Sequence, residues 1–199
     1  MVEVGIVETM RVALLTAANS WSGAEVHTIN LARALRERGH DVVIVELGRR
    51  GYAEASHIIP CPVIHVDLGP DTLQRSPLES LGFRSWQRIL GALQADIAIS
   101  VKGMFKFASL AMEAACRLQF RSYLVIEHMQ PILPELKTRR HFGGLVPGLG
   151  LWWYRQKFSG YLRSIFPHRV ICVSHAVAST LQNDYGYPPS KLVVWHIVG

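Results

Sequence analysis

Short, continuously apolar runs alternate with amphipathic patterns along almost the whole chain. Runs of strand length predict β-strands at residues 11–16, 41–47, 63–66, 96–101, 123–127, 169–173 and 191–196. Between them, apolar residues at helical spacing predict helices at residues 24–38, 85–93 and 105–118, and in the stretch that follows Ser174. Strands that are apolar on both faces are typical of parallel sheets covered by helices on each side. The pattern therefore predicts an α/β fold, namely a Rossmann-like, doubly wound, mostly parallel sheet with helices on both faces.

The predicted helix ends carry recognisable signals. Gly39 is expected to end the first helix, because glycine enters the left-handed conformation without steric cost. Ser174 is expected to be the N-cap of the helix that follows the strand at residues 169–173. The predicted buried face of the first helix consists of Val26, Ile29, Ala32 and Leu35.

The carboxyl ends of the strands are the expected ligand site, because ligands of doubly wound sheets collect there. The loop after the first strand, residues 17–25, runs straight into a helix. Backbone N–H groups at a helix N-terminus, approached closely past Gly23, would form an anion site suited to a phosphate. An ordinary turn capped by Ser22 fits the same loop. The dinucleotide G-x-G-x-x-G pattern does not occur, which weighs against a nicotinamide or flavin enzyme.

Two longer segments are more specific than any single loop. Residues 22–45 read SGAEVHTINLARALRERGHDVVIV, a Gly-containing loop and a glutamate that start a long helix, which ends in Arg-Gly-His before a strand. Residues 168–195 read HRVICVSHAVASTLQNDYGYPPSKLVVW, a strand, a serine, a helix, a Tyr-Gly turn with prolines, and a lysine before another strand. In this order and at this distance, the two resemble the opening and closing segments of the N-terminal, acceptor-side domain of glycosyltransferase family 4. Members of that family have the two-domain GT-B fold.

The resemblance implies retaining transfer of a sugar from a nucleotide diphosphate donor to an acceptor, with no metal, no other cofactor and no protein nucleophile. In the family the glycine of the first loop presents its backbone to the donor phosphates, which gives that role to Gly23. A histidine at the end of the mid-domain strand commonly contacts the donor sugar, so His128 is the expected catalytic residue. An ordinary hydrogen-bonded loop histidine is the alternative for His128.

Four further residues are expected on the acceptor side of the cleft: Ser22, Glu25, Lys102 and Ser174. Glu25 has two alternatives, capping of backbone donors or pairing with a nearby cation. For Lys102 the alternative is an exposed lysine without a ligand.

The resemblance also sets the expected domain organisation. Residues 1–9 are expected to be a short extension, and residues 10–199 the acceptor-side domain. Nothing in the chain resembles the donor-binding domain with its E-x7-E pair, so the chain alone is expected to be inactive until that domain completes it. The residues after His196 also lack the Asn-Gly with which the family crosses to its second domain. A non-catalytic module that binds a glycan, a lipid or a partner subunit is therefore the alternative function.

Composition is that of a globular protein, with 49% hydrophobic and 18% charged residues. The three cysteines are scattered without metal-ligand spacing, which favours free thiols in a reducing cytoplasm. The net charge of +6 suits an anionic membrane surface, a nucleic acid or a phosphorylated substrate, and charge alone does not choose among them. The basic residues are dispersed and form no nucleic-acid motif, so we expect no nucleic-acid partner.

Residues 131–168 combine aromatic and basic side chains, as membrane-interface segments do. The residues expected to contact a membrane are Trp152, Trp153, Arg155 and Lys157. Packing of the two tryptophans under the loop at residues 131–147 is the alternative. Because many family members use lipid-linked acceptors, the expected location is the cytoplasm or the inner face of the plasma membrane, in cell-envelope or exopolysaccharide biosynthesis.

Overall fold

The fold is a parallel sheet covered on both faces, as the apolar pattern predicts. The computed structural model describes residues 8–16, 23–47, 52, 57–66, 81–102, 110–128, 140–141, 146–147 and 165–195. The strands of the main sheet are β1 (Arg11–Thr16), β2 (Asp41–Leu47), β3 (Val63–Val66), β4 (Ile97–Lys102), β5 (Ser122–Glu127), β8 (Arg169–Cys172) and β9 (Leu192–Val194). Its helices are α1 (Gly23–Glu37), α2 (Phe83–Gly91), α3 (Leu110–Gln119) and α7 (His175–Tyr185), with a 3-10 turn, η6 (Pro189–Lys191).

The seven strands lie in the order β3-β2-β1-β4-β5-β8-β9, and every neighbouring pair is parallel. The predicted strand positions are confirmed to within two residues at each end. Strands β2 and β3 extend the sheet on one side of β1, and the later strands extend it on the other side, beginning with β4. The switch point of the sheet is therefore between β1 and β4. A separate two-stranded ribbon, β6 (Arg140–His141) with β7 (Val146–Pro147), is antiparallel and was not predicted.

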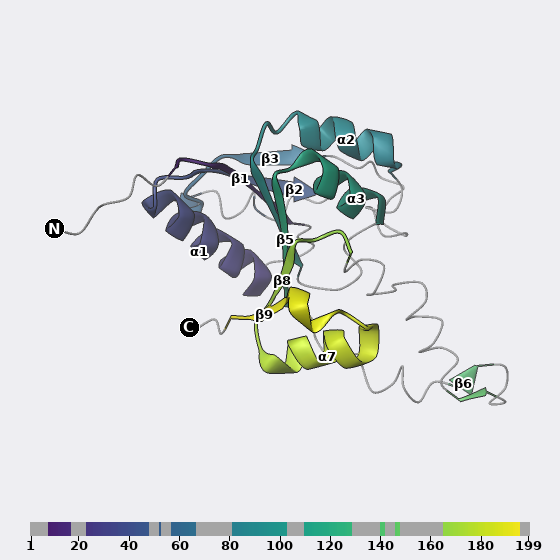
Figure 1. The fold of residues 1–199 in the computed structure, drawn as a ribbon. Coiled ribbons are helices and arrows are strands. Elements are labelled where there is room, and N and C mark those ends of the chain that lie inside the picture. The colour runs from purple at the N-terminus through teal and green to yellow at the C-terminus, as the bar shows by residue number, and fades with distance from the viewer. Residues whose placement is uncertain are drawn as a thin grey trace.

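Two hydrophobic layers hold the helices on the sheet. Alternate residues of β1 point to opposite layers, with Ala13 and Leu15 in one and Val12 and Leu14 in the other. The first layer also contains buried residues of α2, α3 and α7, and the second contains those of α1. Figure 1 shows α1 on one side of the sheet and α2 and α3 on the other. The doubly wound arrangement is thereby confirmed.

The predicted ends of two helices are confirmed. Gly39 has a φ of 85° just after α1, the left-handed conformation that favours glycine. Ser174 is the N-cap of α7, where its Oγ accepts a hydrogen bond from the N–H of Val177 at 3.2 Å. Gly186, with a φ of 70°, ends α7.

The buried face of α1 differs from the prediction at Val26. Val26 is 44% exposed, whereas the polar residues Glu25 and Thr28 are buried with Ile29 and Ala32. Thr28 can occupy the interior because its hydroxyl donates to the carbonyl of Ala24, one turn earlier, at 2.8 Å. The face is therefore rotated toward polar positions that an apolar pattern does not select.

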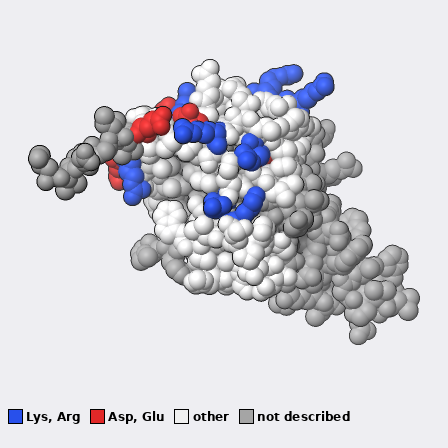
Figure 2. Space-filling view, in the orientation of Figure 1, with Lys and Arg blue, Asp and Glu red and all other residues white. Residues whose placement is uncertain are grey.

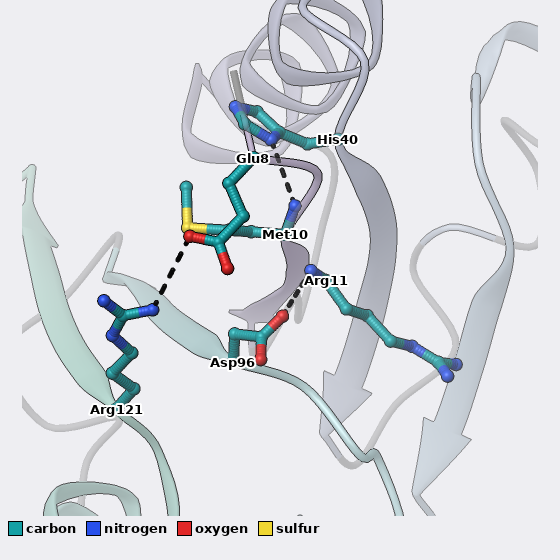
Figure 3. Close-up of polar contacts among 6 residues, drawn as sticks. All are labelled: Glu8, Met10, Arg11, His40, Asp96 and Arg121. Atoms are coloured by element: carbon teal, nitrogen blue, oxygen red, sulfur yellow. Dashed lines mark hydrogen bonds and ion pairs between the residues drawn. The ribbon is translucent and has the colours of Figure 1, made fainter. Parts of the chain in front are cut away.

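The amino ends of the central strands are joined by polar contacts (Figure 3). The N–H of Arg11 donates to Oδ2 of Asp96 at 2.8 Å, and the N–H of Asp96 donates back to the carbonyl of Arg11 at 2.8 Å. The N–H of Met10 donates to Nδ1 of His40 at 3.4 Å, and the N–H of Asp41 donates to the carbonyl of Met10 at 3.0 Å. These contacts hold the starts of β1, β2 and β4 together. The opposite edge of the sheet is the one that the topology marks for ligands.

Candidate functional site

The carboxyl ends of β1, β4 and β5 are adjacent in the sheet, so the residues after them share one edge. Thr16 at the end of β1 lies beside Val101 of β4, and Lys102 at the end of β4 lies beside Glu127 of β5. Glu127 in turn lies beside Cys172 of β8. The switch point between β1 and β4 is at this edge, which is where doubly wound domains bind their ligands.

Gly23 is the first residue of α1, so its backbone is at the helix N-terminus that faces this edge. Its conformation is helical, unlike Gly39 and Gly186, which have positive φ. In the described part of the chain, no atom lies within 4 Å of the position that a Cβ on Gly23 would occupy. Within that part of the chain, neither a positive φ nor a crowded Cβ position requires a glycine here.

His128 directly follows β5 and contacts a second histidine that sequence reasoning missed. Nδ1 of His27, on α1, lies 2.6 Å from Nε2 of His128, and the rings meet edge to face with centroids 4.7 Å apart. His27 is one helical turn after Gly23, so α1 connects the expected phosphate site to the expected sugar contact. The only sequence signal for His27 was its helical i, i+4 spacing from Gly23.

Both imidazoles are biased toward the neutral form. Burial, with a smaller contribution from the nearby His27, lowers the pKa of His128 to about 4. Burial also lowers the pKa of His27. At neutral pH the pair is therefore uncharged, and each ring can act as a hydrogen-bond donor or acceptor without adding charge to the site.

Glu25 lies in the interior below the edge and is 5% exposed. Its carboxylate is close enough to Tyr52, together with that of Glu46, to contribute to a raised Tyr52 pKa. Burial is the main cause, and it raises the pKa of Tyr52 to about 12 against the opposing effect of the Thr28 and Thr16 hydroxyls. Glu25 therefore belongs to a buried polar layer between α1 and the sheet.

Glu46, in the same layer, holds two neighbours. Its Oε1 accepts a hydrogen bond from the N–H of Tyr52 at 2.9 Å, and its Oε2 lies 3.5 Å from Nδ1 of His65. These contacts fix the Glu46 carboxylate near the carboxyl end of β2.

The other predicted site residues are placed only in part. Ser174 is at the carboxyl end of β8, where its hydroxyl caps α7. Lys102 is the last residue of β4, which agrees with its predicted position at this edge. The predicted residues outside the described part of the chain are Ser22, Trp152, Trp153, Arg155 and Lys157.

A family model described as Glycosyltransferase Family 4 matches residues 21–197, which is most of the chain. This chain belongs to glycosyltransferase family 4. The resemblance of the two long segments is confirmed by this match, and so is the Rossmann-like half of a GT-B fold. No curated protein sequence matches the chain.

Solved structures with the same fold are about twice as long. Anabaena Alr3699/HepE in complex with UDP superposes with a TM-score of 0.61 at 19% identity, over 94% of this chain and 44% of that one. A glycosyltransferase from Rickettsia africae gives a TM-score of 0.57 at 17% identity, over 96% of this chain and 43% of that one. A UDP-N-acetylglucosamine 2-epimerase from Rickettsia bellii gives 0.56 at 10% identity, over 94% and 44%. The fold is thus shared with an epimerase, and it is the family match that makes this a domain of a glycosyltransferase family.

Three further observations concern the surface, the helices and possible metal ligands. On the face shown in Figure 2, lysine and arginine side chains lie in separate groups over a mainly uncharged surface. Among the residues that the structure describes, no helix is long and apolar enough to cross a bilayer. Within the same residues, no three or more His, Cys, Asp or Glu side chains gather as metal ligands would, so the histidine pair is not part of a larger cluster there.

Proposed function

We propose that this family 4 domain is the acceptor-side half of a retaining glycosyltransferase, which moves a sugar from a nucleotide-sugar donor to a glycan or lipid-linked acceptor. The observation that carries the proposal is the contact between His27 and His128, which joins α1 to the end of β5 at the switch-point edge. It brings a helix N-terminus suited to phosphate and a neutral histidine suited to sugar hydroxyls onto one side of a single site.

In this proposal Gly23 approaches the donor phosphates and His128 bonds the donor sugar. A neutral imidazole suits that role, because sugar hydroxyls are uncharged and both donate and accept hydrogen bonds. The UDP bound to the structurally similar Anabaena protein supports a nucleotide as part of the donor. The acceptor would meet the edge formed by Ser22, Lys102 and Ser174, with Glu25 supporting it from below.

Completion by a donor-binding domain is part of the proposal, because the family places the groups that stabilise the leaving phosphate there. Such electrostatic stabilisation is usually the largest catalytic contribution. The 199-residue chain should therefore transfer no sugar by itself. The test is incubation of this chain, and of the natural gene product with whatever follows Gly199, with radiolabelled nucleotide sugars and membrane lipid extract. Sugar transfer by this chain alone would contradict the need for a donor-binding domain. If the natural gene product released no nucleotide from any donor, the proposed function would be contradicted.

Gly23 offers a sharper test of the phosphate role. Because no described side chain crowds its Cβ position and its φ is not positive, Gly23→Ala and Gly23→Val should both fold normally, since alanine and valine are better helix formers than glycine. In the natural enzyme Val should lower transfer strongly, and Ala less, since the larger side chain blocks the approach of the phosphates. Full activity of a well-folded Gly23→Val enzyme would mean that this loop is only a turn and does not bind the donor phosphates.

We further propose that the protein works on cell-envelope or exopolysaccharide intermediates at the inner face of the membrane. The supporting observation is the aromatic and basic composition of residues 131–168. Replacing Trp152 and Trp153 with Ala should weaken binding to anionic liposomes and leave the melting temperature nearly unchanged. Core tryptophans behave differently, as Trp86→Ala would show by costing about 3–5 kcal/mol. A double Trp variant that unfolds like Trp86→Ala would contradict the membrane role.

A further inference from the structure

The histidine pair has a geometry that restricts which ring nitrogen can meet a ligand. His27 and His128 are 101 residues apart in sequence, and their nitrogens are 2.6 Å apart. Helix α1 follows β1, His128 follows β5, and β4 lies between these two strands in the sheet. The contact therefore joins the helix that follows β1 to the end of β5, next to the switch point between β1 and β4.

A hydrogen bond between two neutral imidazoles needs one proton between the two nitrogens. One ring donates its N–H and the other accepts with its unprotonated nitrogen, so the tautomer of each ring depends on the other. If both facing nitrogens carried protons, two N–H groups would point at each other across 2.6 Å. Because Nε2 of His128 is engaged by His27, only Nδ1 of His128 remains for another partner.

We propose that His27 is a positioning residue, which selects one of the two coupled tautomer arrangements: its Nδ1 holds Nε2 of His128, so that the His128 ring keeps one orientation and one tautomer and turns Nδ1 toward the donor sugar. The inference rests on the proposed function for the identity of the ligand. The fixed ring itself is a property of this chain and needs no second domain.

Two further observations agree with a fixed pair. The edge-to-face arrangement, with an interplanar angle of 65°, packs the rings against each other and limits rotation of the His128 ring. Burial lowers the pKa of both rings, so the pair stays neutral and keeps its single bridging proton near neutral pH.

The test uses nitrogen NMR of the ¹⁵N-labelled 199-residue chain, in which each imidazole nitrogen reports whether it carries a proton. In the unmodified chain at neutral pH, His128 should show one protonated and one unprotonated nitrogen with well-separated shifts. In His27→Leu, both shifts should move toward the average of two exchanging tautomers. Unchanged His128 shifts in a folded His27→Leu chain would overturn the proposal.

A pair of conservative variants separates positioning from packing. Asparagine places a polar side-chain atom near the position of histidine Nδ1, whereas glutamine places it near that of Nε2. His27→Asn should therefore keep the His128 pattern and His27→Gln should lose it, even if His27→Leu fails to fold. Identical patterns in the two variants would also overturn the proposal. His40→Asn, at the opposite edge of the sheet, is the matched control and should leave His128 unaffected.

Enzymatic activity provides a second test of the positioning role. In the natural gene product His27→Leu should lower kcat on the order of 10-fold, with recovery in His27→Asn, which is the low end of the loss seen when the hydrogen-bond partner of a metal-bound histidine is removed. If the NMR pattern follows the prediction and no donor is turned over by the unmodified protein, the proposed function fails and the fixed ring stands. If turnover occurs and His27→Leu retains full kcat, the positioning role is overturned.

Discussion

The two edges of the central sheet use polar residues in opposite ways. At the amino edge, Arg11 and Asp41 form an ion pair of 3.4 Å with side chains 41% and 61% exposed, and Asp96 bonds the backbone of Arg11. At the carboxyl edge, Thr16, Glu46 and Glu127 are each no more than 3% exposed. Exposed contacts of the first kind contribute little energy each and join strand starts. Buried polar groups are costly unless hydrogen bonds hold them in place. Ligand sites are built from buried polar groups that are fixed in this way.

This comparison explains why the two histidines at the two edges differ in what they can do. His40 accepts a bond from the backbone of Met10 and so helps to close the start of β1 (Figure 3). His128 bonds another side chain through Nε2, and in the proposed function its second ring nitrogen meets the ligand. The contact of His40 with the backbone stabilises the fold, whereas the pair of His27 and His128 can take part in chemistry.

The largest expected effect is on activity at the carboxyl edge. His128→Ala in the natural gene product should lower transfer on the order of 100-fold, because a positioned hydrogen bond to the reacting sugar is removed. The melting temperature should fall only slightly, since the ring is partly exposed at the site. Transfer rates and thermal melts of the same preparation check this, and an equal loss in both measurements would mean that His128 is structural.

Two variants of Ser174 should separate its role as the N-cap of α7 from its proposed role at the ligand site. Ser174→Ala removes the N-cap of α7 and should lower the free energy of unfolding by about 1 kcal/mol. Ser174→Asp keeps the cap and should retain stability, while its charge would repel an anionic ligand at the carboxyl edge. Urea denaturation measures the first effect and transfer the second. An Asp variant with full transfer would confine Ser174 to its capping role.

The histidine pair should give the protein a stability that depends on pH. The folded-state pKa values of His27 and His128 are below the ordinary value of 6.5, that of His128 at about 4. Between those values the unfolded chain binds more protons, so the free energy of unfolding should decrease as pH falls from 6.5. For partly exposed rings we expect a loss of about 1 kcal/mol down to pH 5, less than the full shift would give.

The control for this pH effect is the double variant His27→Leu with His128→Leu. Urea denaturation between pH 5 and 7.5 should show a clearly flatter pH dependence in the double variant. The same slope with and without the two rings would place the effect elsewhere in the chain.

The smallest effect is expected at the amino edge. Asp96→Ala removes the carboxylate that accepts from the N–H of Arg11 at 2.8 Å, an exposed contact. We expect a loss of about 0.5–1 kcal/mol in the free energy of unfolding and no change in transfer by the natural gene product. A loss of activity without a loss of stability would contradict the division between the two edges.

Local chemistry was sufficient for the strands of the main sheet, for two helix ends and for the family, but not for the ribbon of β6 and β7. Continuous apolar runs determine buried parallel strands, and the capping residues Gly39 and Ser174 were predictable because each acts on its own backbone. The position of His128 directly after β5 was predictable from the apolar run before it, while its role stays a prediction that rests on the resemblance. These features depend on neighbours within a few residues, which is the range over which a sequence pattern carries structural information.

Tertiary structure alone decided what these elements bring together. The pattern selected Val26 as buried and left Thr28 out, because it cannot register that a hydroxyl bonded to its own helix is acceptable in the interior. The contact of His27 with His128 depends on the order of β1, β4 and β5 in the sheet. The amino group of Lys191 likewise bonds the carbonyls of Ile165 at 3.0 Å and Pro167 at 2.8 Å, over more than twenty residues. Such pairings arise when packing closes long loops, and no local pattern encodes which distant side chains will then face each other.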